Sequence, residues 1–375
     1  MAFRLQVRNY RGLRAVDWSP EGVCALVGAN GSGKTTLLDV PALLGDALNR
    51  GLARSLEAHG GVAHARNLYA GGDEPYYFEA ALDEVSWHLA PLETERGYRS
   101  EERFVVDGKL VISREAGADV AQVGEVSWPA LDRLALNTTV ALSERSMRLP
   151  KLLSRYRMYG PYDVVNLRRS GSIESSERRL DRHGSNVFSV LRNWRDRSRD
   201  RARYTFVIDG LRELFPGFFE DLEFARAGQV IGADLRLPHD RVHSANLAPD
   251  GWFAALLHLA AIASTGQDDV IAIDEPENAL HPRAIKLLLE HMRTWSRRYE
   301  ATILLATHSP VIISDFDTRP EQLYVMQPDQ PACPAPVTEI KARDWLAHFT
   351  LGDLYTREEF GAPDGDAEHR PPHDR

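Results

Sequence analysis

A glycine-rich segment near the N-terminus has the residue types and spacing that bind phosphate groups. Residues 28–36 read GANGSGKTT and match the pattern G-x-x-x-x-G-K-[ST]. The glycines let backbone N–H groups turn towards phosphate oxygens, the lysine contacts the β- and γ-phosphates, and the hydroxyl after it binds Mg²⁺. A chance match is expected in roughly one chain of this length in a hundred. The sequence therefore predicts a nucleoside triphosphate site formed by Asn30, Gly31, Ser32, Gly33, Lys34, Thr35 and Thr36.

Two further polar positions follow apolar runs in the second half of the chain. Asp274 and Glu275 end the run VIAID, and His308 follows TILLAT. An aspartate in this place can hold Mg²⁺ together with Thr35, and the glutamate beside it can polarise an attacking water. An imidazole at the next strand end can contact the γ-phosphate. Two solvated acids and a structural histidine are the alternative. We predict Thr35 and Asp274 as metal ligands, and Glu275 and His308 as catalytic residues.

The elements that must carry these residues alternate between strands and helices. An apolar strand at 23–28 precedes the glycine-rich loop, and a helix is expected from Gly33 to about Asn49. Further apolar strands are expected at 270–276, 302–309 and 322–328, with a helix at 281–298, which indicates an α/β fold. The remaining expected elements are antiparallel strands over 75–115 with a turn at Asp107-Gly108, a helical stretch over 129–158 and two helices over 188–215.

Together these segments resemble the ABC-type ATPase head. More closely, they resemble the branch that contains the overcoming-lysogenization-defect ATPases, the RecF-like repair proteins and the structural-maintenance-of-chromosomes (SMC) heads. The resemblance is carried by FRLQVRNYRGL (3–13), GANGSGKTTLLD (28–39), HGSNVFSVL (183–191), IDEPENALHP (273–282) and LLATHSP (304–310). It implies an α/β fold of the P-loop NTPase, ABC-ATPase-head type, with an antiparallel β section and an inserted helical section. The expected parts are a first ATPase lobe (1–130), an inserted helical and basic section (131–235), a second ATPase lobe (236–362) and a disordered tail (363–375).

The resemblance also implies how a complete site is built. In that family two heads sandwich two ATP molecules, and the signature helix of each head completes the site of the other. By position, Arg11 would lie near the nucleotide, and the loop with Glu277, Asn278 and His281 would cross the dimer interface. Pro249, Asp250 and Gly251 stand where the family has Ser-x-Gly in its trans signature.

Two departures from the family pattern bear on hydrolysis. Proline suits the first turn of a helix, but Pro249 lacks the serine hydroxyl, and Asp250 adds a negative charge. The family also has a glutamine between the phosphate loop and the inserted domain, whereas residues 41–100 contain none. His64, Arg66 and Asn67 are the candidate replacements. We therefore expect Mg²⁺-dependent ATP binding with slow hydrolysis. The alternatives are a hydrolysing switch and an ATP-clamped scaffold with little turnover.

The charge distribution limits contact with nucleic acid to a local patch. The net charge is −9, so the whole surface is not expected to attract a polyanion. A solvated helix with i,i+4 charge pairs is the alternative to a DNA patch, because Asp196 and Asp200 interleave with the arginines. The candidate patch for DNA backbone phosphates consists of Arg192, Arg195, Arg197, Arg199, Arg201 and Arg203.

The remaining expectations concern partners and location. Two separate cysteines, no signal peptide and a longest apolar run of about 13 residues indicate a cytoplasmic protein without a membrane contact.

Residues 341–362 resemble the closing segment of stand-alone ATPases that work beside a separately encoded, often nuclease-like protein in anti-phage defence modules. We expect no nuclease domain after His308, since about 65 residues follow it in the sequence. We expect a homodimer that regulates such an effector in phage defence or DNA maintenance, or a RecF-like repair ATPase.

Overall fold

The computed structural model describes most of the chain. The described residues are 2–61, 65–67, 74–94, 97–129, 134–138, 143–327, 333–346, 348–357 and 360. The tail expected to be disordered (363–375) and the candidate His64 lie outside these residues. Among the described helices, none is both long and apolar enough to cross a membrane.

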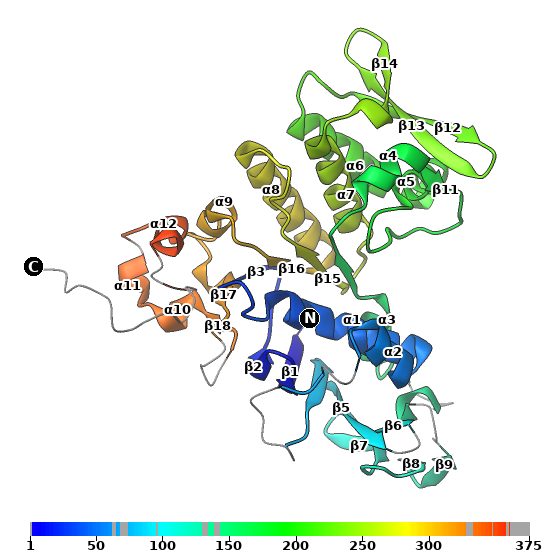
Figure 1. The fold of residues 1–375 in the computed structure, drawn as a ribbon, viewed down its shortest axis with the longest axis vertical. Coiled ribbons are helices and arrows are strands. Elements are labelled where there is room, and N and C mark those ends of the chain that lie inside the picture. Colours follow the sequence, from blue (N-terminus) through cyan, green and yellow to red (C-terminus); the bar gives the residue numbers. More distant parts are fainter. Residues whose placement is uncertain are drawn as a thin grey trace, which may run out of the picture.

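A six-stranded sheet at the centre of the molecule carries the predicted site (Figure 1). Its first five strands are parallel, and β18 pairs antiparallel with β17. The predicted apolar strands are confirmed at β3, β15, β16 and β17, because continuous apolar runs suit strands that are buried on both faces. In spatial order the strands are β10 (Arg157–Tyr159), β15 (Val270–Asp274), β16 (Thr302–Ala306), β3 (Val23–Val27), β17 (Leu323–Val325) and β18 (Ala335–Pro336).

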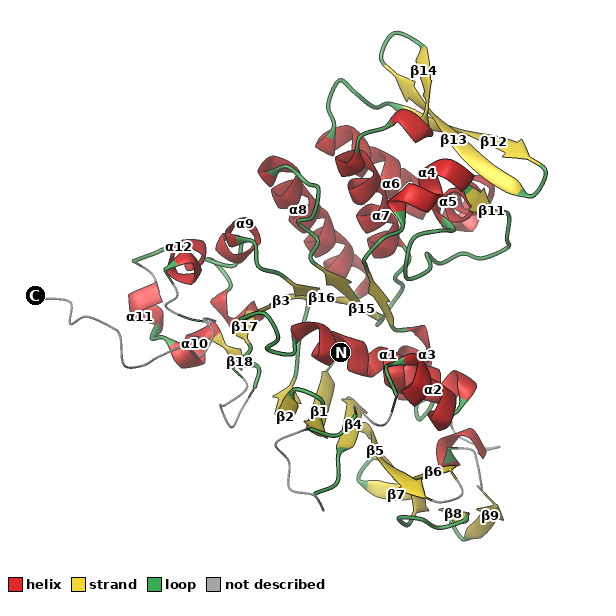
Figure 2. Ribbon diagram, viewed as in Figure 1, coloured by secondary structure: helices red, strands yellow, loops and turns green. Residues whose placement is uncertain are grey.

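The two faces of this sheet belong to two hydrophobic cores. In β3, Ala25 faces one core with α7 (Asp250–Ala263) and α8 (Pro282–Tyr299). Leu26 faces the other core with α1 (Lys34–Arg50). This alternation follows from the two-residue period of a strand. The glycine-rich loop and the catalytic candidates therefore lie at the carboxyl edge of a sheet that is covered by helices on both sides (Figure 2).

An eight-stranded antiparallel sheet packs below α1. The predicted Asp107-Gly108 hairpin is confirmed: both residues have positive φ, 51° and 72°, as a type I′ turn requires. In spatial order the strands are β2 (Leu13–Trp18), β1 (Phe3–Tyr10), β4 (Tyr77–Leu82), β5 (Val85–Thr94), β6 (Gly97–Val106), β7 (Lys109–Arg114), β8 (Val120–Val123) and β9 (Val126–Pro129).

A helical layer and a small antiparallel sheet cover α7 on its outer side. The two helices expected over 188–215 are confirmed as α5 (Val187–Asp196) and α6 (Arg201–Leu214). The section expected to be helical also contains β11 (Ser172–Ile173), β12 (Asp221–Ala227) and β13 (Val230–Leu237), with β14 (Arg241–Ser244) after it. The remaining elements of this part are α4 (Val164–Ser170), η3 (Ser198–Asp200) and η4 (Ala245–Leu247).

The helical stretch expected over 129–158 is wrong for most of its described residues. Only α3 (Arg148–Arg155) is an α-helix there, and η2 (Ala135–Thr138) is a single 3₁₀ turn. Residues 157–159 form β10, whose pairing with β15 overrides local propensity. The other described elements are α2 (Leu52–Ala58), α9 (Pro310–Ser314), η5 (Pro320–Gln322), α10 (Val337–Ile340), α11 (Arg343–Leu346) and α12 (Leu351–Thr356).

Candidate nucleotide site

The glycine-rich loop joins β3 to α1 and depends on residues without a side chain. Gly28 has φ 152°, and a Cβ there would lie 2.7 Å from the carbonyl oxygen of Met326. Gly33 has φ 95° at the start of α1, and a Cβ there would lie 2.8 Å from Leu13 Cδ2. Only glycine fits both positions. The loop therefore keeps its backbone at the N-terminus of a 17-residue helix, where anions are favoured.

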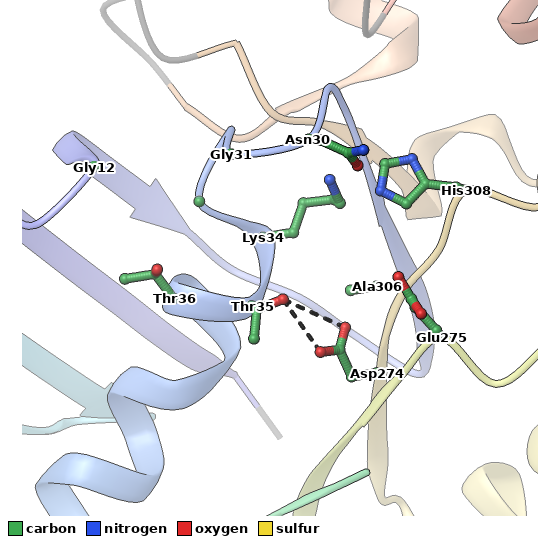
Figure 3. Close-up of a pocket in the computed structure, with 11 residues that line it drawn as sticks. Gly12, Asn30, Gly31, Lys34, Thr35, Thr36, Asp274, Glu275, Ala306 and His308 are labelled. Carbon is green, nitrogen blue, oxygen red and sulfur yellow. Dashed lines mark hydrogen bonds between the residues drawn. The ribbon is translucent and has the colours of Figure 1, made fainter. Parts of the chain in front are cut away.

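A cavity of about 240 Å³ opens beside this loop (Figure 3). It brings together most of the predicted phosphate, metal and catalytic residues, although they come from β3–α1, β15 and β16. Ser32 does not line it, and its hydroxyl is buried without a hydrogen-bond partner among the described residues. The lining residues are Gly12, Asn30, Gly31, Gly33, Lys34, Thr35, Thr36, Asp274, Glu275, Ala306 and His308.

Lys34 lies folded back against its own loop. Its Nζ donates to the carbonyl oxygens of Gly28 and Ala29, each at 2.9 Å. Burial lowers the pKa of Lys34, while the charges of Asp274 and Glu275 act in the opposite direction. The ammonium is thus partly desolvated and bound only to neutral carbonyls, so a phosphate can replace them as its partner.

Thr35 and Asp274 meet across the base of the cavity. Thr35 Oγ1 lies 3.2 Å from Asp274 Oδ2, and Figure 3 shows the two side chains turned towards each other. Burial raises the pKa of Asp274, and the charges of Glu275 and Glu277 add to this shift. A hydroxyl and a carboxylate supply the hard oxygen donors that Mg²⁺ prefers. The pair fits the predicted metal site, where a bound Mg²⁺ would neutralise charge on the β- and γ-phosphates.

Glu275 has an unusual backbone conformation for its residue type. Its φ is 49°, and its N–H donates to the carbonyl oxygen of Ala306 at 2.9 Å. A non-glycine residue in this region costs about 1–3 kcal/mol, and such strain is concentrated at functional sites. Asn278 Nδ2 donates to Glu275 Oε2 at 2.9 Å. Asn278, which was expected at the dimer interface, therefore orients the candidate base of its own chain.

His308 is held by contacts from two other segments of the chain. Glu277 Oε1 accepts hydrogen bonds from the His308 N–H at 3.0 Å and from Thr307 Oγ1 at 2.8 Å. Tyr355 of α12 places its hydroxyl 2.9 Å from His308 Nδ1. Burial lowers the pKa of His308 and nearby Lys34 lowers it further, while the carboxylates of Glu275 and Glu277 act in the opposite direction. Sequence reasoning missed Tyr355, because no local pattern connects the last helix with a strand end 47 positions earlier.

The signature-like residues lie outside the cavity lining. Pro249 forms the N-cap of α7, and its backbone oxygen accepts from Trp252 N at 3.0 Å. Asp250 Oδ1 lies 2.6 Å from Arg168 Nη2, which also donates to the carbonyl of Ala248 at 2.8 Å. The negative charge expected from Asp250 is thus paired with Arg168, a residue that sequence reasoning did not assign to the site.

Gly251 meets the loop that follows the acidic pair. A Cβ at Gly251 would lie 2.7 Å from the carbonyl oxygen of Ala279, which itself has φ 64°. His281, the other predicted residue of this loop, caps α8 by accepting from Arg283 N at 3.3 Å. The start of α7 and this loop therefore touch through backbone atoms within one chain.

Arg11 does not line the cavity, whereas its neighbour Gly12 does. The Arg11 guanidinium lies 5.2 Å from the centroid of the Tyr10 ring. Asn67 Nδ2 donates to the Arg11 carbonyl at 2.6 Å. The backbone of Arg66 pairs with that of Tyr10 in an isolated antiparallel β-bridge. Arg66 and Asn67, the described candidates for the missing glutamine, thus support the turn before the cavity and are not among its lining residues.

The predicted DNA patch is largely engaged in contacts within the chain. Arg192 pairs with Glu174 at 2.8 Å and Arg195 with Asp196 at 2.9 Å. Arg199 lies 3.8 Å from Asp200. Arg203 donates to the carbonyl oxygens of Ala263 and Thr265. Arg197 and Arg201, which flank η3 on its two sides, complete the patch. Three of the six arginines, Arg192, Arg195 and Arg199, thus have the carboxylate partners expected from the charge-paired alternative.

Residues 155–314 match the family described as AAA domain, putative AbiEii toxin, Type IV TA system. The matched segment contains Asp274, Glu275 and His308, while the phosphate loop lies before it. No curated protein shows significant sequence similarity to the chain.

One solved structure, an SMC head, supports the same fold, and two others are similar at lower TM-scores. An SmcHead bound to the C-winged helix domain of ScpA is 12% identical, with a TM-score of 0.52, over 86% of this chain and 94% of that chain. The SMC head domain from Thermotoga maritima is 12% identical (TM-score 0.43) over the same shares. The ATP binding subunit of an ABC transporter is 15% identical (TM-score 0.42) over 94% of this chain and 98% of that chain. The predicted α/β fold class is confirmed, and the family match shows that residues 155–314 are similar to an AAA domain.

Proposed function

We propose that this protein binds ATP with Mg²⁺, hydrolyses it slowly and uses the cycle to switch a head-to-head dimer. The observation that carries the proposal is the convergence of Lys34, the Thr35–Asp274 pair, Glu275 and His308 on one cavity. Lys34 would bind the β- and γ-phosphates. Glu275, oriented by Asn278, would accept a proton from the attacking water.

The size of the cavity supports a site shared between two chains. Its volume of about 240 Å³ is below the range of about 300–1,000 Å³ for complete small-molecule pockets. Pro249 to Gly251 do not line it, although the family resemblance gives them a nucleotide contact in trans. A second copy would supply the missing wall from the start of α7.

The proposed role is to regulate a separately encoded effector, nuclease-like, in phage defence or DNA maintenance. The related SMC head is bound to a domain of another protein, ScpA, which supports a protein partner for this fold. A RecF-like repair ATPase is the alternative that shares the same chemistry. Deleting the neighbouring gene of the native operon and scoring phage resistance would separate the two roles.

An ATP-clamped scaffold is the second candidate. Pro249 favours this candidate, because it caps α7 and has no hydroxyl that could donate to a γ-phosphate. The presence of a strained and oriented Glu275 favours hydrolysis instead, because a clamp needs no base.

Steady-state ATP hydrolysis measured against protein concentration tests the proposal. The variants are wild type, Glu275→Gln and Lys34→Ala, each with and without duplex DNA. We expect activity to rise more than linearly with concentration in the wild type, and to be lost in Glu275→Gln while ATP binding remains. Lys34→Ala should lose binding. Equal and negligible hydrolysis by wild type and Glu275→Gln, with intact ATP binding, would support the scaffold.

A further inference from the structure

A second polar cavity lies at the opposite edge of the central sheet. Asp269 precedes β15 and lines this cavity, whereas Asp274 ends the same strand at the nucleotide site. Its volume of about 520 Å³ lies within the range of ligand pockets. We name it the arginine pocket; its lining residues are Ser154, Arg155, Arg157, Ser176, Glu177, Arg178, Arg179, Arg203, Ser264, Gly266 and Asp269.

The arginine pocket is positively charged in a chain of net charge −9. Five arginines and two carboxylates line it. Asp269, 2% exposed, pairs with Arg179 and accepts from Gly266 N at 2.8 Å. Behind the lining, Asp200 Oδ2 accepts from Arg178 Nε at 2.9 Å. These buried carboxylates fix two guanidinium groups in place, and three more arginines add to the positive charge.

Two of the arginines have little or no carboxylate contact. Arg157 Nη1 donates to the carbonyls of Ser154 at 3.1 Å and Tyr156 at 2.7 Å. Among the residues that the structure describes, no carboxylate lies within ion-pair distance of Arg157. Arg155 has a side chain 55% exposed and approaches Asp269 only at 3.7 Å. Both can therefore bind an anion without breaking a close ion pair.

The chemistry of the lining selects phosphate groups. A guanidinium presents a planar fork of donors that matches phosphate oxygens, and Ser154 and Ser176 add hydroxyls. All lining residues are serine, arginine, glycine or acidic, so no aromatic or aliphatic side chain is present to stack on a nucleobase. Recognition would therefore use charge and would not depend on the base.

We propose that the arginine pocket binds a ligand through its phosphate groups, with Arg155 and Arg157 as the principal contacts. The phosphates could belong to a nucleic-acid backbone or to a free oligophosphate. The site differs from the patch predicted from the sequence, because only Arg203 is common to both. Phosphate binding at the arginine pocket also does not depend on ATP hydrolysis at the other edge of the sheet.

Equilibrium binding to the full-length protein tests the proposal with two probes, inorganic triphosphate and a fluorescein-labelled single-stranded 12-mer of mixed sequence. All proteins carry Lys34→Ala, which removes the phosphate-loop contribution. We expect Arg155→Gln/Arg157→Gln to weaken binding of at least one probe more than tenfold. The matched control Arg192→Gln/Arg195→Gln should change it less than twofold.

The two probes distinguish the sources of phosphate. Binding of triphosphate alone would assign a free oligophosphate. Binding of the 12-mer would assign a nucleic-acid backbone, and the double variant should then reduce the salt slope by about 1.4. If the double variant does not fold, the single variant Arg155→Gln, at an exposed position, replaces it in the binding test. Binding of neither probe, or an equal loss in the control pair, would overturn the proposal. Glu275→Gln should leave this binding unchanged, which separates it from the ATPase proposal.

Discussion

His308 Nδ1 lies 2.9 Å from the hydroxyl of Tyr355, which ties the last described helix to the nucleotide site. α12 is also fixed to α9, the short helix that follows His308. The N–H of Leu351 donates to Asp317 Oδ1 at 2.8 Å, and a Cβ at Gly352 would overlap the Pro310 carbonyl and Ser314 Oγ. The contact fixes the orientation of the imidazole towards the phosphate loop. Tyr355 is therefore a positioning residue for His308.

Removing this hydroxyl should slow ATP turnover. A hydrogen bond of this kind is worth about 0.5–1.5 kcal/mol, so Tyr355→Phe should lower kcat about 2- to 12-fold. KM should stay within twofold, because Tyr355 does not line the cavity. The measurement is steady-state ATPase activity as a function of ATP concentration.

The chain offers a matched control for this variant. Tyr162 and His258 form a second tyrosine–histidine contact, with the hydroxyl 3.2 Å from Nδ1, away from the phosphate loop. Tyr162→Phe should leave kcat unchanged. Equal losses of kcat in both variants would show that Tyr355 acts only through general stability.

Arg168 should protect the proposed composite site from the charge of Asp250. Arg168 is half-buried, pairs with Asp250 at 2.6 Å and also donates to the Ala248 carbonyl, so Arg168→Gln should cost about 1–2 kcal/mol of folding stability. In a head-to-head pair the freed carboxylate would face the partner's triphosphate. An added charge there is worth about 1–4 kcal/mol, so ATPase activity should fall about fivefold or more.

Removing both charges should restore activity. In Arg168→Gln/Asp250→Asn no charge faces the triphosphate, so most of the lost rate should return, as a double-mutant cycle of ATPase activities would show. If the double variant is no faster than Arg168→Gln, Asp250 is not the cause of the loss.

His59 should make folding stability depend on pH. Burial alone would lower the pKa of His59, but Asp39 at 2.6 Å and Asp46 at 3.2 Å together raise it. A raised pKa contributes stability that is fully present below about pH 6.5 and is lost as the pH rises through the folded-state pKa. His59→Gln should therefore cost about 1.5–3 kcal/mol at pH 5.5 and clearly less at pH 9.

Urea unfolding of both proteins at the two pH values measures this difference. His243→Gln, at an exposed position of β14, is the control and should show no such dependence. A cost for His59→Gln that is equal at pH 5.5 and pH 9 would exclude a charged His59 between the two aspartates.

The sequence predicted the parts of the site that local patterns encode. The glycine-rich loop and the acidic pair combine a motif with an adjacent apolar strand, so both element and chemistry could be identified. The strand β10 could not be predicted from the sequence. Its three residues RMY are too few to show a hydrophobic period, and they form a strand only by pairing with β15.

Contacts between distant segments were equally inaccessible. Arg168 reaches Asp250 across 82 positions, and Tyr355 reaches His308 across 47. Neither residue belongs to a motif. The arginine cluster expected from Arg192 to Arg203 was visible in sequence, but Glu174, which pairs with Arg192, comes from another segment. Sequence patterns identified reactive groups, and tertiary contacts determine which of them remain available.

Gly251 should resist substitution for a steric reason. Gly251→Ala would place a Cβ 2.7 Å from the Ala279 carbonyl, and such overpacking costs about 1–3 kcal/mol. Gly232→Ala in β13 has open space around the new methyl group and is the control. Thermal unfolding should show a lower midpoint for Gly251→Ala than for Gly232→Ala, and the opposite order would rule out the close contact.

The contact between Gly251 and Ala279 has a consequence for the proposed head-to-head dimer. In that dimer one chain would use Glu275, four residues before Ala279, on its own nucleotide and would contribute the start of α7 to its partner's nucleotide site. Because the backbones of Gly251 and Ala279 touch, a shift of the loop with Ala279 after hydrolysis would also move the start of α7. Hydrolysis in one protomer would thus be transmitted to the site of its partner, and the two ATP molecules would be hydrolysed cooperatively. Gly251→Ala should then change the Hill coefficient for ATP.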